Sequence, residues 1–206
     1  MGQILESLAV VIQSMESRIL VLGPVSAGKT TLIRTISDID VLDTDETPTD
    51  EVAESKSGTT VAMDLGVVKI DDDDRIVLYG APGQARFRFM WEILLGQTEA
   101  ILLLIDHSGA DPVGDLRNHL HHLRDLWSKP LPVVIGITHV DANASVPLSI
   151  YTEALSGMDC TWVHAQSSPP IVELDARSRD DVRAGLLVLA ALVDMNQRFG
   201  PASERL

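Results

Sequence analysis

Eight consecutive residues combine glycine, lysine and threonine in an order that suits the binding of a polyanion. Gly23–Thr30 reads Gly-Pro-Val-Ser-Ala-Gly-Lys-Thr, the pattern GxxxxGK[ST], and directly follows the apolar run Arg18–Leu22. Small residues let successive backbone N–H groups point inward, and a helix that starts after the loop adds its positive N-terminal dipole. The pattern therefore predicts a loop that binds the phosphates of a nucleoside triphosphate.

Each part of this loop has an expected task. Lys29 is predicted to reach the β- and γ-phosphates, and the Thr30 hydroxyl is predicted to bind Mg²⁺, the usual companion of bound phosphates. The remaining phosphate contacts are expected from Gly23, Val25, Ser26, Ala27, Gly28 and Thr31.

Two later segments contain residues that suit the hydrolysis of a bound triphosphate. A polar, acidic stretch at 38–57 ends before Thr60, which opens a predicted strand and is expected to complete Mg²⁺ coordination. In Leu78–Phe87, the Gly83 N–H is expected to bind the γ-phosphate, and Gln84 is expected to orient the attacking water. Gln84 is thus the candidate catalytic residue.

A third segment suits recognition of the base. Ile137–Asp141 lies at the end of an apolar run and is followed far downstream by Leu174–Arg177. A carboxylate at Asp141 can accept both guanine N1–H and the exocyclic amine, whereas adenine offers no such pair of donors. The segment therefore favours guanine.

The elements around these segments follow an alternating order. Ala100–Ile105 and Leu131–Ile137 are near-continuous apolar runs, as expected for strands covered on both faces. Residues 60–70 and 75–79 flank four aspartates and predict a hairpin. Two helical stripes lie between and after these runs, one at Leu116, Leu120, Leu123 and Trp127 and one at Val182, Leu186, Leu189 and Val193. The order predicts an α/β sheet with one antiparallel strand.

Composition narrows the class of partner. The formal charge is −14, from 30 acidic and 16 basic residues, which disfavours nucleic acid and anionic lipid surfaces. No apolar run approaches the roughly 18 residues of a membrane span, so no membrane insertion is expected. A single cysteine, Cys160, fits a reducing compartment, and the predicted location is the cytoplasm.

The predicted domain organisation is simple. Leu5, Leu8, Ile12 and Met15 recur at helical spacing, so residues 1–17 are expected to form an amphipathic helical extension. That helix would either cover this domain's own core or dock on a partner. Residues 18–200 form the predicted nucleotide-binding domain, and residues 201–206 form a C-terminal tail.

Three stretches, GPVSAGKTT, TTVAMDLG and LYGAPGQARF, resemble the bacterial branch of the Ras-like small GTPases. That branch includes the MglA gliding-motility proteins and the GTP-binding members of actinobacterial conservons. The resemblance implies a P-loop fold with a mostly parallel six-stranded sheet, one antiparallel edge strand and helices on both faces. It also implies GTP/GDP as ligand with Mg²⁺, a regulator of the roadblock/LC7 class, and an effector.

The resemblance extends to individual base-binding residues. Thr138 and Asp141 match the ends of the NKxD or TKxD motif, with His139 at the place of the lysine that stacks on the base. Ala176 matches the backbone donor to guanine O6, and Arg177 follows it.

Departures from the family pattern indicate slow hydrolysis. Gly80 stands where an aspartate usually holds a Mg²⁺-bound water, and Val25 could crowd the water-orienting glutamine. Arg86 and Arg88, close behind Gln84, are candidates for an internal arginine finger. The predicted function is a GTP/GDP-dependent switch with slow intrinsic hydrolysis. The alternatives are an ATP-using P-loop enzyme and a nucleotide-binding scaffold that does not hydrolyse.

Overall fold

A computed structural model of the whole chain gives the fold. It describes residues 16–43, 63–70, 74–84, 87, 89–127, 131–158 and 168–199. Within these ranges, no helix is long and apolar enough to cross a membrane.

A twisted, mostly parallel sheet forms the centre of the fold, with the strand order β2-β3-β4-β1-β5-β6-β7. Parallel pairing joins neighbouring strands across most of the sheet. The strands joined in this way are β1 (Glu16–Leu22), β4 (Arg75–Gly80), β5 (Ala100–Asp106), β6 (Val133–Thr138) and β7 (Ile171–Glu173). The strand β3 (Asp64–Lys69) pairs antiparallel with β4, as the predicted hairpin requires. The predicted sheet is confirmed, and the two-residue strand β2 (Leu42–Asp43) extends its edge beyond β3.

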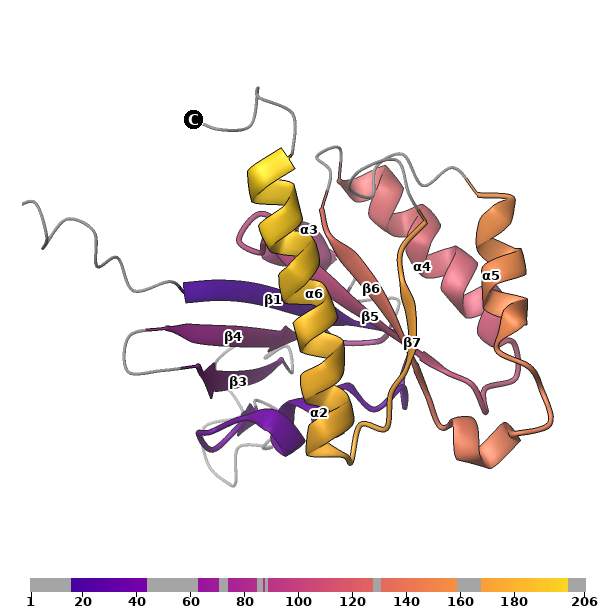
Figure 1. Cartoon of the computed structure of the whole chain (residues 1–206), viewed down its shortest axis with the longest axis horizontal. Helices are drawn as coiled ribbons and strands as arrows, with labels where there is room; N and C mark the ends of the chain where they lie inside the picture. The colour runs from indigo at the N-terminus through magenta and orange to yellow at the C-terminus, as the bar shows by residue number, and fades with distance from the viewer. Residues whose placement is uncertain are drawn as a thin grey trace, which may run out of the picture.

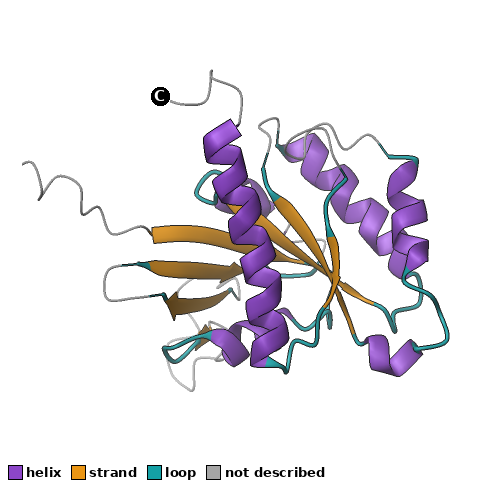
Figure 2. Ribbon diagram, in the orientation of Figure 1, coloured by secondary structure: helices purple, strands orange, loops and turns teal. Residues whose placement is uncertain are grey.

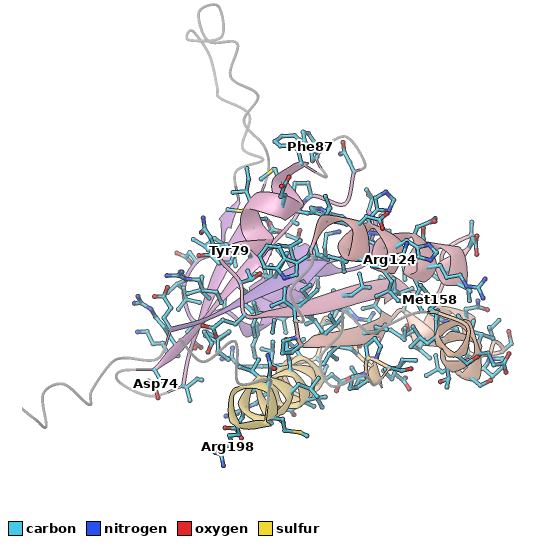
Figure 3. The ribbon with its side chains drawn as sticks, turned by 90° about the horizontal axis from the view of Figure 1, so that it is seen from above. Asp74, Tyr79, Phe87, Arg124, Met158 and Arg198 are labelled. Carbon is cyan, nitrogen blue, oxygen red and sulfur yellow. The ribbon has the colours of Figure 1, made fainter. Side chains whose placement is uncertain are left out.

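Helices cover both faces of this sheet (Figure 1). On one face lie α2 (Lys29–Ile36) and the long α6 (Arg179–Phe199). On the other lie α3 (Phe89–Leu95), α4 (Pro112–Leu126) and α5 (Ser149–Ser156). Seen from above, the sheet separates α6, with Arg198 at its outer end, from the layer that contains Arg124 and Met158 (Figure 3).

Alternating side chains of the central strands divide the core in two. On β1, Leu20 and Leu22 pack under α3, α4 and α5, whereas Ile19 and Val21 pack under α2 and α6. All six apolar residues of Ala100–Ile105 are buried in β5. This two-sided burial explains the unbroken apolar runs in the sequence. The predicted stripes on α4 and α6 face their respective clusters, with Leu120 and Leu189 almost fully buried.

The parallel strands deliver their following loops to one edge of the sheet (Figure 2). β1 leads into residues 23–28, β6 into the short 3₁₀ helix η2 (Val140–Asn143), and β7 into the turn before α6. Ligands of such sheets bind at the carboxyl ends of the strands. The start of β1 at Glu16 places the last two residues of the predicted N-terminal helix in a strand, and residues 1–15 lie outside the described part.

Candidate nucleotide-binding site

The loop between β1 and α2 adopts a backbone that few residues other than glycine tolerate. Gly23 has a φ of 145°, Gly28 a φ of 87°, and Ser26 a φ of 70°. A Cβ on Gly23 would lie 2.2 Å from the carbonyl oxygen of Leu104, so the loop must pass that close to β5. The helix α2 then begins at Lys29. Its N-terminus therefore faces the loop, as an anion site requires.

Lys29 is held inside this loop by backbone carbonyls. Its Nζ donates to the carbonyl oxygen of Gly23 at 2.9 Å and to that of Pro24 at 2.6 Å. Burial lowers the pKa of Lys29 to about 8, although the nearby charge of Asp64 opposes the shift. An ammonium in this position would regain favourable charge interactions from bound phosphates.

Thr30 makes a contact that links the loop to the antiparallel strand. Its Oγ1 donates to Oδ2 of Asp64 at 2.6 Å. Asp64 is the first residue of β3 and pairs with Gly80, the last residue of β4. A hydroxyl next to a carboxylate forms an oxygen donor set of the kind that Mg²⁺ prefers.

The residues around Gly80 leave no room for a side chain at this position. A Cβ there would lie 2.7 Å from Cδ1 of Ile33, 2.9 Å from Cβ of Asp64 and 3.1 Å from Oδ2 of Asp64. The carboxylate beside Thr30 thus comes from β3, whereas the sequence had directed attention to the missing aspartate on β4. The interpretation of Gly80 as a departure from the usual aspartate took no account of Asp64.

The loop after β4 touches the phosphate loop directly. A Cβ on Gly83 would lie 2.7 Å from the backbone nitrogen of Val25 and 2.9 Å from the carbonyl oxygen of Gly23. Gln84 follows and is exposed, and its carbonyl accepts from the Phe87 N–H at 3.0 Å. The structure brings Gly83 against the phosphate loop, and Gln84 follows it in the chain. Thr60, Arg86 and Arg88 lie outside the described residues.

The other loop side chains divide between core and solvent. Ala27 is buried, whereas Val25, Ser26 and Thr31 are exposed, with Val25 at 59%. The side chain of Val25 therefore projects away from the core into solvent.

Thr138 anchors the end of β6 to the phosphate loop. It is buried, and its Oγ1 lies 3.1 Å from the carbonyl oxygen of Ala27 and 3.2 Å from that of Ile105. The next residue, His139, has a left-handed backbone with a φ of 55°. Its Nδ1 lies 3.1 Å from Oδ1 of Asp106, although the contact lacks good hydrogen-bond geometry.

Charged side chains surround a cavity of about 250 Å³ between the ends of β6 and β7. Arg177 Nη2 donates to Oδ2 of Asp141 at 3.2 Å, and Arg177 also makes two side-chain hydrogen bonds of 2.8 Å to Asp175. These contacts with Arg177 lower the pKa of Asp175 to about 2. Ala176 is buried, and a Cβ on Gly28 would lie 3.1 Å from its Cβ. The turn after β7, which borders the cavity, therefore touches the phosphate loop at Ala176.

Sequence reasoning missed three carboxylates in this region. Asp64 lies within the stretch TTVAMDLG, Asp106 directly follows the apolar run Ala100–Ile105, and Asp175 separates Leu174 from Ala176. One signal in the sequence could have identified Asp64. In the predicted hairpin, this aspartate on the first strand lies opposite Gly80 at the end of the second.

Comparison with known proteins identifies the family. Residues 38–161 match the model of a family described as "Conserved hypothetical ATP binding protein". The chain belongs to this family. An uncharacterized protein of Methanocaldococcus jannaschii is 32% identical over 129 residues, which span 62% of this chain and 73% of that protein.

Membership of this ATP-binding family, together with the phosphate loop at Gly23–Thr30, makes the chain a nucleotide-binding protein of the P-loop type. The matched region begins after the loop and includes β3, β4, β5 and β6. The assignment to the Ras-like small GTPases was wrong, because the matching family is described by ATP binding. Short stretches of this kind are phosphate-binding motifs shared by many P-loop families, so they do not distinguish among those families. The roadblock/LC7 regulator and the effector rested on the resemblance and lose their basis with it.

Proposed function

We propose that the chain binds ATP together with Mg²⁺ at Gly23–Thr30 and hydrolyses it slowly. The observation that carries this proposal is the contact between Thr30 and Asp64, beside a lysine already positioned in the loop. A loop, a cation, a hydroxyl and a carboxylate are the parts that a triphosphate and its metal ion require.

Thr30 and Asp64 are the residues that would hold the metal ion. Mg²⁺ demands oxygen ligands, keeps several waters and usually takes only one or two protein groups in addition to phosphate. A bound Mg²⁺ neutralises charge on the phosphates. Thr60 remains a candidate for a further ligand.

Gln84 is the residue that would orient the attacking water. The absence of a side chain on Gly83 lets its backbone approach Pro24 and Val25 closely, which supports the proposal that its N–H binds the γ-phosphate. Gln84 itself is exposed and must be ordered before it can act. Ordering a long side chain costs conformational entropy, which supports slow turnover. Arg86 and Arg88 remain the candidate fingers.

Adenine is the proposed base. The family description supports ATP, and the pair of Asp141 and Arg177 provides an acceptor beside a donor. Adenine presents a 6-amino donor next to the N1 acceptor, which complements such a pair. His139 would stack on the base, and Ala176 would contribute its backbone. GTP is the second candidate, favoured by the ability of Asp141 to accept from two guanine donors.

Nucleotide-stripped protein and a fluorescent ATP analogue test this proposal. Displacement by ATP, GTP, ADP and GDP is measured with Mg²⁺ and with EDTA, and phosphate release is followed separately. Mg²⁺-dependent binding that prefers ATP and is lost in Lys29→Ala supports the proposal. A preference for GTP would replace ATP by the second candidate. Binding without phosphate release, in wild type as in Gln84→Leu, would leave a nucleotide-binding scaffold.

A further inference from the structure

An apolar groove lies on the sheet face covered by α2 and α6. It has a volume of about 270 Å³ and runs between α6, the end of α2 and the hairpin strands β3 and β4. Two large apolar side chains that line the groove are exposed to solvent: Leu187 is 64% exposed and Ile70 is 63% exposed. Apolar surface concentrated in this way indicates a contact site.

The chain enters the sheet beside this groove. Glu16, the first residue of β1, pairs with Arg75 in the sheet register, and its Oε2 accepts from Arg75 Nε at 2.8 Å. The next residue of β4, Ile76, lines the groove. The segment 1–15 is therefore attached to the fold next to the groove wall.

The chemistry of residues 1–15 complements the groove. Leu5, Leu8, Ile12 and Met15 form an apolar stripe at helical spacing, and Glu6 is the one charged side chain of the segment. The groove combines an apolar floor with three basic side chains and one acidic side chain at its rim, namely Lys69, Arg179, Arg183 and Asp38. Asp38 is already paired with Arg179 at 2.7 Å. The rim thus has a net positive charge for Glu6 to approach.

The lengths also agree. A helix of 15 residues is roughly 22 Å long, and the part of α6 from Arg179 to Ala190 that borders the groove is roughly 18 Å long. We propose that residues 1–15 dock as an amphipathic helix in this groove of their own chain and cover Leu187 and Ile70. The proposal concerns folding of the chain and does not depend on which nucleotide binds.

A cysteine pair tests this contact in the full chain. Leu8→Cys is combined with Leu187→Cys in a Cys160→Ser background, and Leu8→Cys with Ile93→Cys is the control. Ile93 is 61% exposed but lies on α3, across the sheet. Under mild oxidation the first pair is expected to form an intramolecular disulfide, and the control is not. A disulfide that links isotopically light and heavy copies would overturn the proposal in favour of a second copy as the occupant.

Hydrogen exchange gives an independent measurement. In wild type, peptides from residues 1–15 are expected to exchange at least tenfold more slowly than an unstructured chain. Leu187→Asp should remove that protection, whereas Ile93→Asp should leave it, with β5 peptides unchanged in both variants as the check on folding. Wild-type peptides that already exchange at the unstructured rate would overturn the proposal.

Discussion

Asp64→Asn separates the metal-binding role of Asp64 from its structural one. Asparagine has nearly the same shape and keeps an oxygen that can accept the Thr30 hydroxyl, now 2.6 Å from Oδ2. It removes the negative charge and replaces one acceptor oxygen by an amide NH2 group. The fold should therefore persist, because the register of Asp64 against Gly80 involves backbone groups.

The expected effect on nucleotide affinity depends on Mg²⁺. Even a residue that only supports a metal ligand typically contributes about 10–100-fold in metal affinity, so a carboxylate that holds the ion itself should contribute at least that much. At about 1.4 kcal/mol per tenfold change, this is about 1.4–2.8 kcal/mol. Without Mg²⁺, the same substitution removes a negative charge beside Lys29 and the phosphates. Affinity in EDTA should then stay the same or increase. Opposite responses in the two buffers are the signature of a metal-binding carboxylate.

The assay is displacement of a fluorescent ATP analogue at constant ionic strength, with Mg²⁺ and with EDTA. Wild type is compared with Asp64→Asn, Thr30→Ser and the control Asp115→Asn, a half-buried carboxylate on α4. Thr30→Ser keeps the hydroxyl and should bind like wild type. Equal losses of affinity in both buffers, or no loss with Mg²⁺, would refute the role assigned to Asp64.

Three further predictions concern other parts of the site. Burial holds the pKa of Lys29 at about 8 in the free protein, and bound phosphates would keep its ammonium charged. Nucleotide affinity should therefore fall as the pH rises above 8. Calorimetry in two buffers at pH 9 should show that nucleotide binding takes up about one proton. Gly83→Ala should lower stability by about 1–3 kcal/mol and weaken nucleotide binding, because the new Cβ would lie 2.7 Å from backbone atoms of the phosphate loop. The control Gly157→Ala, whose Cβ would enter open space, should change neither stability nor binding. Thermal unfolding and nucleotide-binding assays measure the two effects. Arg177→Ala should reduce ATP affinity about tenfold and narrow the difference between ATP and GTP in competition assays, whereas the exposed Arg124→Ala should have no effect.

Local periodicity was sufficient to predict the layers of this fold. The run Ala100–Ile105 had to be covered on both faces, and the helical stripe at Val182, Leu186 and Leu189 had to face a sheet. The phosphate loop was equally predictable, because the backbone geometry of eight consecutive residues determines which residue types it accepts. Gly23 and Gly28 both have a positive φ, as the pattern requires.

Contacts between distant segments were beyond prediction from one sequence. The partner of Thr30 lies 34 residues away and depends on the register of β3 against β4. The contact of Arg177 with Asp141 spans 36 residues and depends on where β6 and β7 end. Motif spacing also could not identify the family, because phosphate-binding stretches recur in many P-loop proteins that differ in base and partner.

Substitutions at Gly80 provide the last test. The small-GTPase pattern expects a metal-binding aspartate at this position, whereas the structure leaves room only for glycine. If the site lacked a carboxylate, Gly80→Asp would restore Mg²⁺-dependent affinity. The structure predicts the reverse, since the new Cβ would lie 2.9 Å from Cβ of Asp64 and a second negative charge would oppose the first. Gly80→Ala measures the packing cost alone, about 1–3 kcal/mol in thermal unfolding. A gain in Mg²⁺-dependent affinity for Gly80→Asp over Gly80→Ala would contradict this account, because it would mean that Asp64 leaves room and need for another carboxylate.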